Sequence, residues 1–277
     1  MSEERESCEN AGPDCNGALS GEPCRNDLTS AKMEACENLS AQTARSETFG
    51  YTLACAFAFC GFGAGLFFMH IVASFHTPES LILKLLLGLL PFQITAPLMA
   101  LTVLKQMAMW KGWHGALEWD IPHLETLQRY RIHAALFVSA IFCAVLLNLL
   151  SKAICDRLGI PFEEQSLIQM THGNTNVFFW AIAFFSVMIL APCTEEMIYR
   201  LVLYKTLNGV LHRHWLAASL TALCFALAHG VMPMVPALFA LGMLFQEAKR
   251  RGGLKQSILL HSCYNGLMLV LVLLFGE

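Results

Sequence analysis

The sequence predicts an all-α protein, a polytopic transmembrane bundle of about seven or eight helices that follows a disordered acidic tail. Of the 277 residues 56% are hydrophobic and only 14% are charged, whereas soluble domains carry about a quarter charged residues. The mean hydropathy is +0.52, and the apolar residues gather in blocks as long as a membrane-spanning helix. A net charge of −3 gives no reason to expect a nucleic-acid partner. We therefore expect an integral, multi-pass membrane protein whose first partner is the lipid bilayer.

Composition divides the chain into three regions, 1–48, 49–175 and 176–277. Residues 1–48 are rich in carboxylates and poor in large apolar side chains, so we expect a disordered acidic tail. Within it only 28–39 has the pattern of a short helix, and the basic stretch and apolar run of a signal peptide are missing. Residues 49–175 hold the first transmembrane helices and an interfacial loop, and 176–277 hold the polar residues that indicate a function.

Apolar blocks predict helices throughout the second and third regions, at 51–75, 81–104, 134–150, 176–191, 195–211, 215–231, 235–248 and 257–275. Gly61, Gly63 and Gly65 in the first block are of the kind that lets neighbouring helices approach closely. Pro192 should break the chain between two of the later helices, with Thr194 capping the second.

The polar connection 105–133 carries three tryptophans and several basic residues, as loops at a membrane interface do. By the positive-inside rule this connection places the amino terminus inside. Eight complete spans would then put Lys249, Arg250 and Arg251 on the opposite side, against the same rule. The sequence leaves this conflict open.

The 11 cysteines show no spacing that is typical of disulfides or of zinc sites. Four of them lie in the polar tail, and most of the others lie in apolar runs, where cysteine behaves as a small hydrophobic residue. We therefore expect reduced thiols and a tail that faces a reducing compartment.

Three charged residues, Glu195, Glu196 and Arg200, interrupt the apolar sequence within one predicted helix. Ionised side chains are expensive in lipid unless they are paired or line a wet cavity. A spacing of four lets Glu196 and Arg200 meet on one helix face, so this pair can neutralise itself. Adjacent residues point in different directions, which leaves Glu195 free to act as a general base. The structural alternative is an ion-pair cluster that holds the bundle together.

Two later apolar helices carry further polar residues. His229 lies within one of them, and His261 and Asn265 lie four residues apart on one face of the other. A single histidine in such a segment is more often a packing residue. Together with Glu195, however, these groups comprise a base, an orienting imidazole and donors for a developing oxyanion. The set therefore indicates hydrolytic chemistry.

Three motifs resemble those of the CPBP family, the intramembrane CAAX proteases and bacteriocin-processing proteins that are also called the Abi family. The motifs are Glu195-Glu196-x-x-x-Arg200, Phe225-x-x-x-His229 and His261-x-x-x-Asn265. The runs 236–242 and 251–258 extend the resemblance, which covers about 176–275. Leu201 stands where many bacterial members have glycine, a difference that concerns local helix packing.

The resemblance implies that residues 176–277 form an intramembrane protease core. It implies that Glu195, assisted by His229, is the base that activates water. His261 and Asn265 would then stabilise the tetrahedral oxyanion.

The resemblance gives Glu196 and Arg200 a supporting role in that arrangement. The family has been described both as metalloproteases and as glutamate-dependent proteases. Glu195, His229 and His261 would suit a catalytic zinc, which takes three protein ligands and water. They come, however, from three separate helices and include no His-Glu-x-x-His pair. We therefore expect no cofactor, with zinc as the alternative.

The sequence as a whole predicts an intramembrane endopeptidase that acts on a membrane-associated protein or peptide, with prenylated CAAX-type proteins among the candidates. The protein would lie in the cytoplasmic membrane of a bacterium or in the endoplasmic reticulum of a eukaryote. Two other classes remain open. One is a non-catalytic immunity or scaffold protein of the same family, and the other is a transporter, although the two halves of the chain show no repeat.

Overall fold

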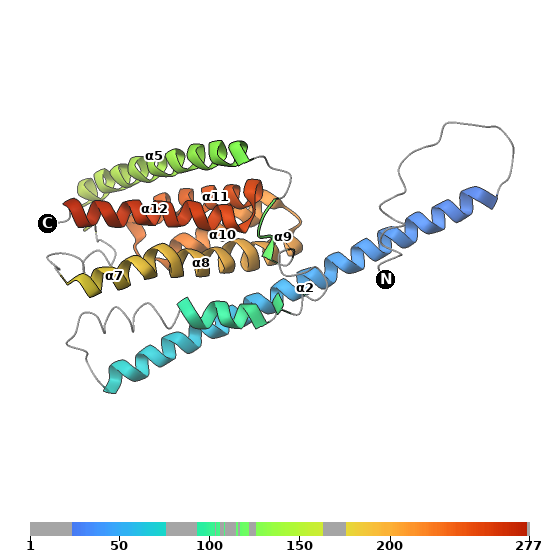
Figure 1. Cartoon of the computed structure of the whole chain (residues 1–277), viewed down its shortest axis with the longest axis horizontal. Coiled ribbons are helices and arrows are strands. Elements are labelled where there is room, and N and C mark those ends of the chain that lie inside the picture. The colour runs from blue at the N-terminus through green and yellow to red at the C-terminus, as the bar shows by residue number, and fades with distance from the viewer. Residues whose placement is uncertain are drawn as a thin grey trace. The chain divides into compact units, whose positions relative to one another are not determined.

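The computed structural model describes residues 24–75, 93–102, 104–105, 108, 115, 117–121, 126–162 and 176–275. Within these ranges the chain is helical apart from short turns and contains no strand. Figure 1 shows the long helices and their order along the chain. The prediction of an all-α bundle is therefore confirmed.

The first helices are α2 (Cys24–Phe75), α5 (Thr126–Leu158), α7 (Val177–Phe185), the π-helix η1 (Ser186–Leu190) and α8 (Ala191–Glu195). They are followed by the π-helix η2 (Glu196–Leu203), α9 (Tyr204–Leu211), α10 (His214–Ala228), the 3-10 turn η3 (Met232–Met234), α11 (Val235–Gly252) and α12 (Leu254–Phe275). Three continuous helices in the described part are long and apolar enough to cross a membrane, namely Thr126–Leu158, Val177–Leu211 and Leu254–Phe275.

The first helix begins much earlier than its apolar block predicts. Helix α2 starts at Cys24, whereas the sequence predicts disorder up to residue 48 and a span from 51. No proline or glycine occurs between Cys24 and Phe49, so nothing stops the helix of the span from extending into the polar sequence. Residues 1–23 of the predicted tail lie outside the described residues.

One cysteine of the tail also departs from prediction. Cys36 is disulfide-bonded, which corrects the expectation of reduced thiols at this position. The spacing of isolated cysteines gives no indication of which of them come together. Seven of the described cysteines are free, two of them later in α2 and five in the helices that follow: Cys55, Cys60, Cys143, Cys155, Cys193, Cys224 and Cys263. The chain separates into two units, residues 1–47 and 48–277, and the packing below is that of the second.

The first and second apolar blocks meet at a glycine, as the sequence predicts. The hydroxyl of Thr95 donates to the carbonyl of Gly61 at 2.7 Å. A Cβ added at Gly61 would lie only 2.7 Å from the carbonyl oxygen of Thr95. Gly63, in contrast, faces open space. Of the second predicted span, 81–92 lies outside the described residues and 93–102 is helical.

The predicted break at Pro192 is wrong, because the helix runs without interruption from Val177 to Leu211. Two π-helical stretches, η1 and η2, lie on either side of α8. In η1 the N–H of Ala191 bonds to the carbonyl of Ser186, five residues earlier, and this wider register tolerates a proline. The hydroxyl of Thr194 does not cap a helix. It donates instead to the carbonyl of Gln93 at 2.8 Å.

Helix α11 is central to the carboxy-terminal bundle and packs against α5, α10 and α12 (Figure 1). Their shared core is apolar, with Ala144, Phe225, Phe245 and Leu260 among its buried side chains. A second core forms between α2, the helical residues near 100, and η2. The η2 segment, which carries the predicted catalytic motif, therefore contacts both halves of the bundle and is held from several sides.

Residues 117–121 of the predicted connection and the turn after α11 lie at the same end of the bundle. The N–H groups of Leu254 and Lys255 donate to the carbonyls of Glu118 and Trp119 at 2.8 and 3.0 Å. These bonds satisfy amides at the start of α12 that have no partner within the helix. Glu118 and Trp119 thus lie at the same end of the bundle as the basic residues that end α11, an arrangement that the positive-inside rule allows.

Candidate active site

The centre of the polar cluster is Glu196, which is completely buried. Its Oε2 atom accepts from Nε of Arg200 at 3.2 Å and lies 2.5 Å from the hydroxyl of Ser257. Its Oε1 atom lies 2.9 Å from Nδ1 of His261. Burying a carboxylate is unfavourable unless an opposite charge pairs with it and donors form hydrogen bonds to it. Arg200 supplies the opposite charge to Glu196, and Ser257 and His261 supply hydrogen bonds. The predicted pair of Glu196 and Arg200 is therefore present. Glu196 also bonds to Ser257 and His261, which both lie in α12.

The guanidinium of Arg200 is also fully buried, and it lies among aromatic rings. Its Cζ atom lies 4.9 Å from the ring centre of Phe225, 5.9 Å from that of Phe245 and 6.0 Å from that of Tyr199. Neither Nη atom has a hydrogen-bond partner within the described residues. Cation–π contacts and the carboxylate of Glu196 are therefore what balances this charge.

Glu195 differs from Glu196 because, among the described residues, the Oε2 atom of its carboxylate forms no hydrogen bond. The side chain is 17% exposed, and its Oε2 atom lies 3.8 Å from Nε2 of His261. That separation is too long for a direct hydrogen bond, and Oε2 has no other partner in the described part of the chain. Glu195 is thus the free carboxylate that the sequence predicts, and it faces His261.

The orientation of His261 is fixed from two directions. Its Nδ1 atom bonds to the carboxylate of Glu196, so Nδ1 carries a proton and donates. Its ring stacks on Phe245, with centroids 4.4 Å apart and an angle of 16° between the planes. The Nε2 atom is thereby directed toward Glu195, where a neutral imidazole accepts a hydrogen bond and an imidazolium donates one.

His229 lies directly after α10 and is half-buried. Its Nδ1 atom lies 2.8 Å from the carbonyl of Phe225, so this nitrogen must be the donor. The Nε2 atom of the neutral ring is then an acceptor. The rings of His229 and His261 both pack edge-on against Phe225, with centroids 4.8 and 5.9 Å away. One aromatic side chain therefore contacts both histidines.

Asn265 makes a contact that the sequence does not predict. Its Nδ2 atom donates to the carbonyl of Val187 at 3.1 Å. In the register of η1 this carbonyl would accept from the residue five positions later, which is Pro192 and has no N–H. Asn265 therefore satisfies a carbonyl that its own helix cannot. Its second amide hydrogen remains available to a ligand.

Sequence reasoning missed Ser257 and the aromatic rings around Arg200. Ser257 precedes His261 by four residues, so the spacing rule that links His261 with Asn265 points to it as well. Its hydroxyl also lies 2.8 Å from the carbonyl of Phe245. The aromatic contacts had no comparable signal, because phenylalanine in an apolar helix is ordinarily a packing residue.

The predicted zinc ligands are suited to the metal by chemistry, since Glu195 and both Nε2 atoms are acceptors. The placement of these side chains fits a zinc ion less well than their chemistry does. The described residues contain no group of three or more His, Cys, Asp or Glu side chains placed to hold a metal ion. Of the three predicted ligands, Glu195 and His261 approach one another, with Oε2 3.8 Å from Nε2.

A comparison with protein families identifies a relationship for the carboxy-terminal helices. Residues 176–267 match the sequence model of a family described as type II CAAX prenyl endopeptidase Rce1-like. The matched segment contains the six predicted site residues, Glu195, Glu196, Arg200, His229, His261 and Asn265. No curated protein and no solved structure matches the chain. The predicted resemblance to CAAX-type membrane proteases is therefore confirmed, and with three apolar helices the chain is an integral membrane protein.

Proposed function

We propose that this chain, an integral membrane protein whose residues 176–267 match the Rce1-like family, is an intramembrane endopeptidase. It hydrolyses a peptide bond in a membrane-associated protein or peptide, and prenylated CAAX-type proteins are the substrate class that the family suggests. The observation that carries the proposal is the free carboxylate of Glu195, 3.8 Å from a histidine that a second, buried glutamate orients.

In the first step of the proposed reaction Glu195 acts as the general base. Its unpartnered Oε2 takes a proton from water while the water oxygen bonds to the carbonyl carbon of the substrate. The Nε2 atom of His229 is an acceptor because Nδ1 donates to Phe225, so His229 can help to orient the same water. The carbonyl oxygen becomes an oxyanion.

His261 and Asn265 then stabilise the oxyanion. In its protonated form His261 carries an N–H at Nε2 as well as at Nδ1. An imidazolium held by Glu196 at Nδ1 presents its second N–H toward Glu195. The amide hydrogen of Asn265 that Val187 does not use adds a second donor.

The tetrahedral intermediate collapses when the carbon–nitrogen bond breaks. The proton that Glu195 removed from water goes to the departing amine, so the products are a carboxylic acid and an amine and Glu195 is again ionised. Glu196, Arg200 and Ser257 touch no reacting atom in this scheme. They are positioning residues that fix the tautomer and the direction of His261.

The test is cleavage by the purified full-length protein in detergent. We expect hydrolysis of a membrane-tethered peptide, compared in farnesylated and unmodified forms, with products identified by mass spectrometry. Glu195→Gln should lower the rate at least about 100-fold, since a general base contributes about 10²–10⁴-fold. The control Glu247→Gln makes the same change on the surface of α11 and should retain the rate. Full activity of Glu195→Gln would refute the assignment of the base.

The same preparation tests the alternatives. We propose water activation without a metal, so activity should survive a chelator, and stoichiometric zinc with chelator-sensitive cleavage would overturn that choice. A non-catalytic immunity or scaffold protein predicts no cleavage at all and a cellular phenotype that Glu195→Gln leaves intact.

A further inference from the structure

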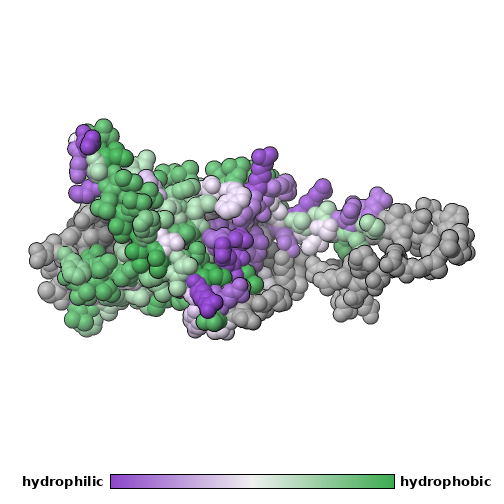
Figure 2. All heavy atoms as spheres, turned by 90° about the horizontal axis from the view of Figure 1, so that it is seen from above, coloured by the Kyte–Doolittle hydropathy of each residue, from purple (hydrophilic) through white to green (hydrophobic). Residues whose placement is uncertain are grey.

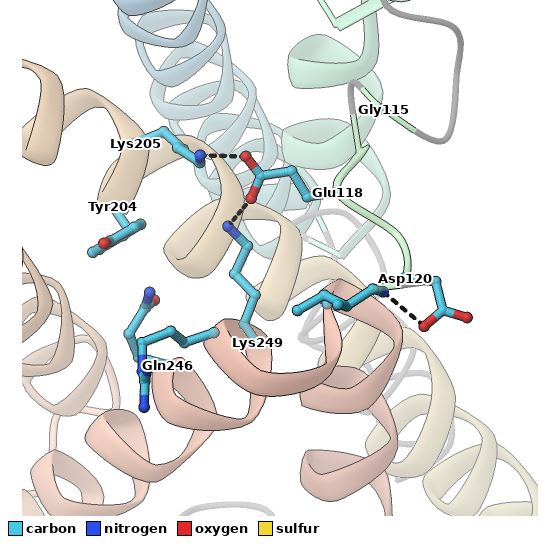
Figure 3. A pocket seen from close by; sticks show the side chains of 10 residues that line it. Gly115, Glu118, Asp120, Tyr204, Lys205, Gln246 and Lys249 are labelled. Atoms are coloured by element: carbon cyan, nitrogen blue, oxygen red, sulfur yellow. Dashed lines mark hydrogen bonds and ion pairs between the residues drawn. The ribbon is translucent and has the colours of Figure 1, made fainter. Parts of the chain in front are cut away.

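A pocket of about 540 Å³ lies at the polar end of the bundle, apart from the proposed catalytic residues. Figure 3 shows it between the 115–121 segment and helices α9 and α11. Its lining includes Glu118, Asp120, Tyr204, Lys205, Gln246 and Lys249. The volume is in the range of small-ligand sites, about 300–1,000 Å³, and the proposed peptidase reaction makes no use of it.

The pocket carries one positive charge in excess. Lys205 and Lys249 both form salt bridges with the single carboxylate of Glu118, as the dashed lines in Figure 3 show. Lys249 is only 5% exposed, so this cation is built into the wall.

The other two ionised groups of the lining already have partners. Arg250 pairs with Glu247, with Nε 2.6 Å from Oε2, but it shares this carboxylate with Arg251, and both arginines are about half exposed so that water screens them. Asp120 pairs with Arg129. The two lysines and Glu118 therefore leave a net charge of +1 for a ligand to balance.

Gln246 adds an acceptor that has no partner. Its side chain lines the pocket and is 4% exposed, and its Oε1 atom makes no hydrogen bond within the described residues. A buried acceptor without a donor is unfavourable. A ligand that completes this site therefore supplies one negative charge and an N–H or O–H group.

The pocket lies at one end of a helix that is long enough to span a membrane, and a bilayer places its headgroups at the ends of such helices. It stands where the spanning helix Leu254–Phe275 begins and where α11 ends in Lys249, Arg250 and Arg251. Figure 2 shows hydrophilic residues gathered beside the apolar helices on one face of the molecule. Basic residues at such a boundary attract anionic headgroups.

We propose that this pocket binds a phospholipid headgroup whose phosphodiester pairs with Lys205 and Lys249 and whose hydroxyl or ammonium group donates to Gln246. A phosphodiester carries a single negative charge, which matches the excess of one. Phosphatidylglycerol and phosphatidylethanolamine both have the required donor. Phosphatidylcholine does not, because its quaternary ammonium has no N–H. A soluble phosphate ester such as glycerol 3-phosphate shares this chemistry and is separated from the lipid by experiment.

The experiment is native mass spectrometry and thermal unfolding of the detergent-purified full chain with added lipid. Phosphatidylglycerol and phosphatidylethanolamine should each form a one-to-one adduct and raise the Tm, and phosphatidylcholine should do neither. Lys205→Gln should weaken the adduct about 10-fold or more, as expected for loss of a charged hydrogen bond, and Gln246→Leu should weaken the phosphatidylglycerol adduct about 3-fold or more, as expected for loss of a neutral one. The control Lys255→Gln removes an exposed cation at the same end of the bundle that does not line the pocket, and it should bind like the wild type.

Equal binding of phosphatidylcholine and phosphatidylglycerol, or binding that neither pocket variant changes, would refute the site. Saturation by glycerol 3-phosphate without lipid would assign the pocket to a soluble phosphate ester instead. These outcomes are independent of peptide cleavage, so they stand whether or not the proposed peptidase activity is found.

Discussion

Two glutamates of this protein each join more than one helix, but they do so in different environments. Glu196 is completely buried and binds Arg200, Ser257 and His261. Glu118 lies at the polar end, with 31% of its side chain exposed, and binds two lysines. Both are bridging carboxylates, and only their burial and the kind of partner distinguish them.

The difference indicates what each cluster is suited to do. At the polar end water can replace a lost partner, so the Glu118 cluster can exchange contacts with a ligand. In the bundle interior no water can do so, and the partners of Glu196 must stay in place. A rigid second glutamate is what allows Glu195, one residue earlier, to remain free and still face a well-oriented His261.

The largest expected effect is on stability when Glu196 loses its charge. Glu196→Gln leaves Arg200 buried without a counter-ion, and breaking a buried pair in this way costs about 3–5 kcal/mol. Denaturant unfolding of the full chain in detergent measures this loss. Glu195→Gln is the matched control, because Glu195 has no ion-pair partner as close, and it should change the unfolding free energy little. Equal stability of the two variants would show that burial does not distinguish the two residues.

An intermediate effect is expected at Asn265. Asn265→Leu leaves the carbonyl of Val187 without a donor, which should cost about 1–3 kcal/mol. In a Pro192→Ala background residue 192 regains an N–H that can bond to Val187. The same substitution should then be less harmful, and a double-mutant cycle measures the coupling. Strictly additive effects would contradict the explanation of this contact.

The smallest effect is expected at Glu118. Glu118→Gln should cost about 1 kcal/mol, the upper end for exposed ion pairs, because Glu118 and Lys205 are about a third exposed although Lys249 is buried. Added salt should reduce the difference. Burial favours a raised pKa for Glu118, but Lys249 and Lys205 outweigh it and hold the pKa below its ordinary value of 4.5.

The sign of the pH dependence follows from that lowered pKa. The contribution of Glu118 is fully present above pH 4.5 and is lost as the pH falls through the folded-state pKa. Thermal unfolding of the wild type and of Glu118→Gln, compared across this range, should therefore converge at low pH. A difference that grows on acidification would contradict the assignment.

Much of the candidate site follows from residue spacing. The pairing of Glu196 with Arg200 follows from a separation of four residues in a helix, and the freedom of Glu195 follows from its adjacency to Glu196. The contact between Glu196 and His261 joins residues 65 positions apart. No local rule predicts it, because it depends on how α12 packs against η2.

The sequence by itself determined the class of the protein, since long apolar blocks bury their surface only in a membrane or in other helices. It also determined which polar side chains carry the motif, because such groups are costly in those blocks. The tertiary structure alone decided that Pro192 lies within a continuous helix. A π-helical register and the amide of Asn265 together replace the hydrogen bond that proline removes. That replacement comes from a helix more than 70 residues later, as the 78-residue separation of Asn265 and Val187 shows, so no local pattern around Pro192 contains it.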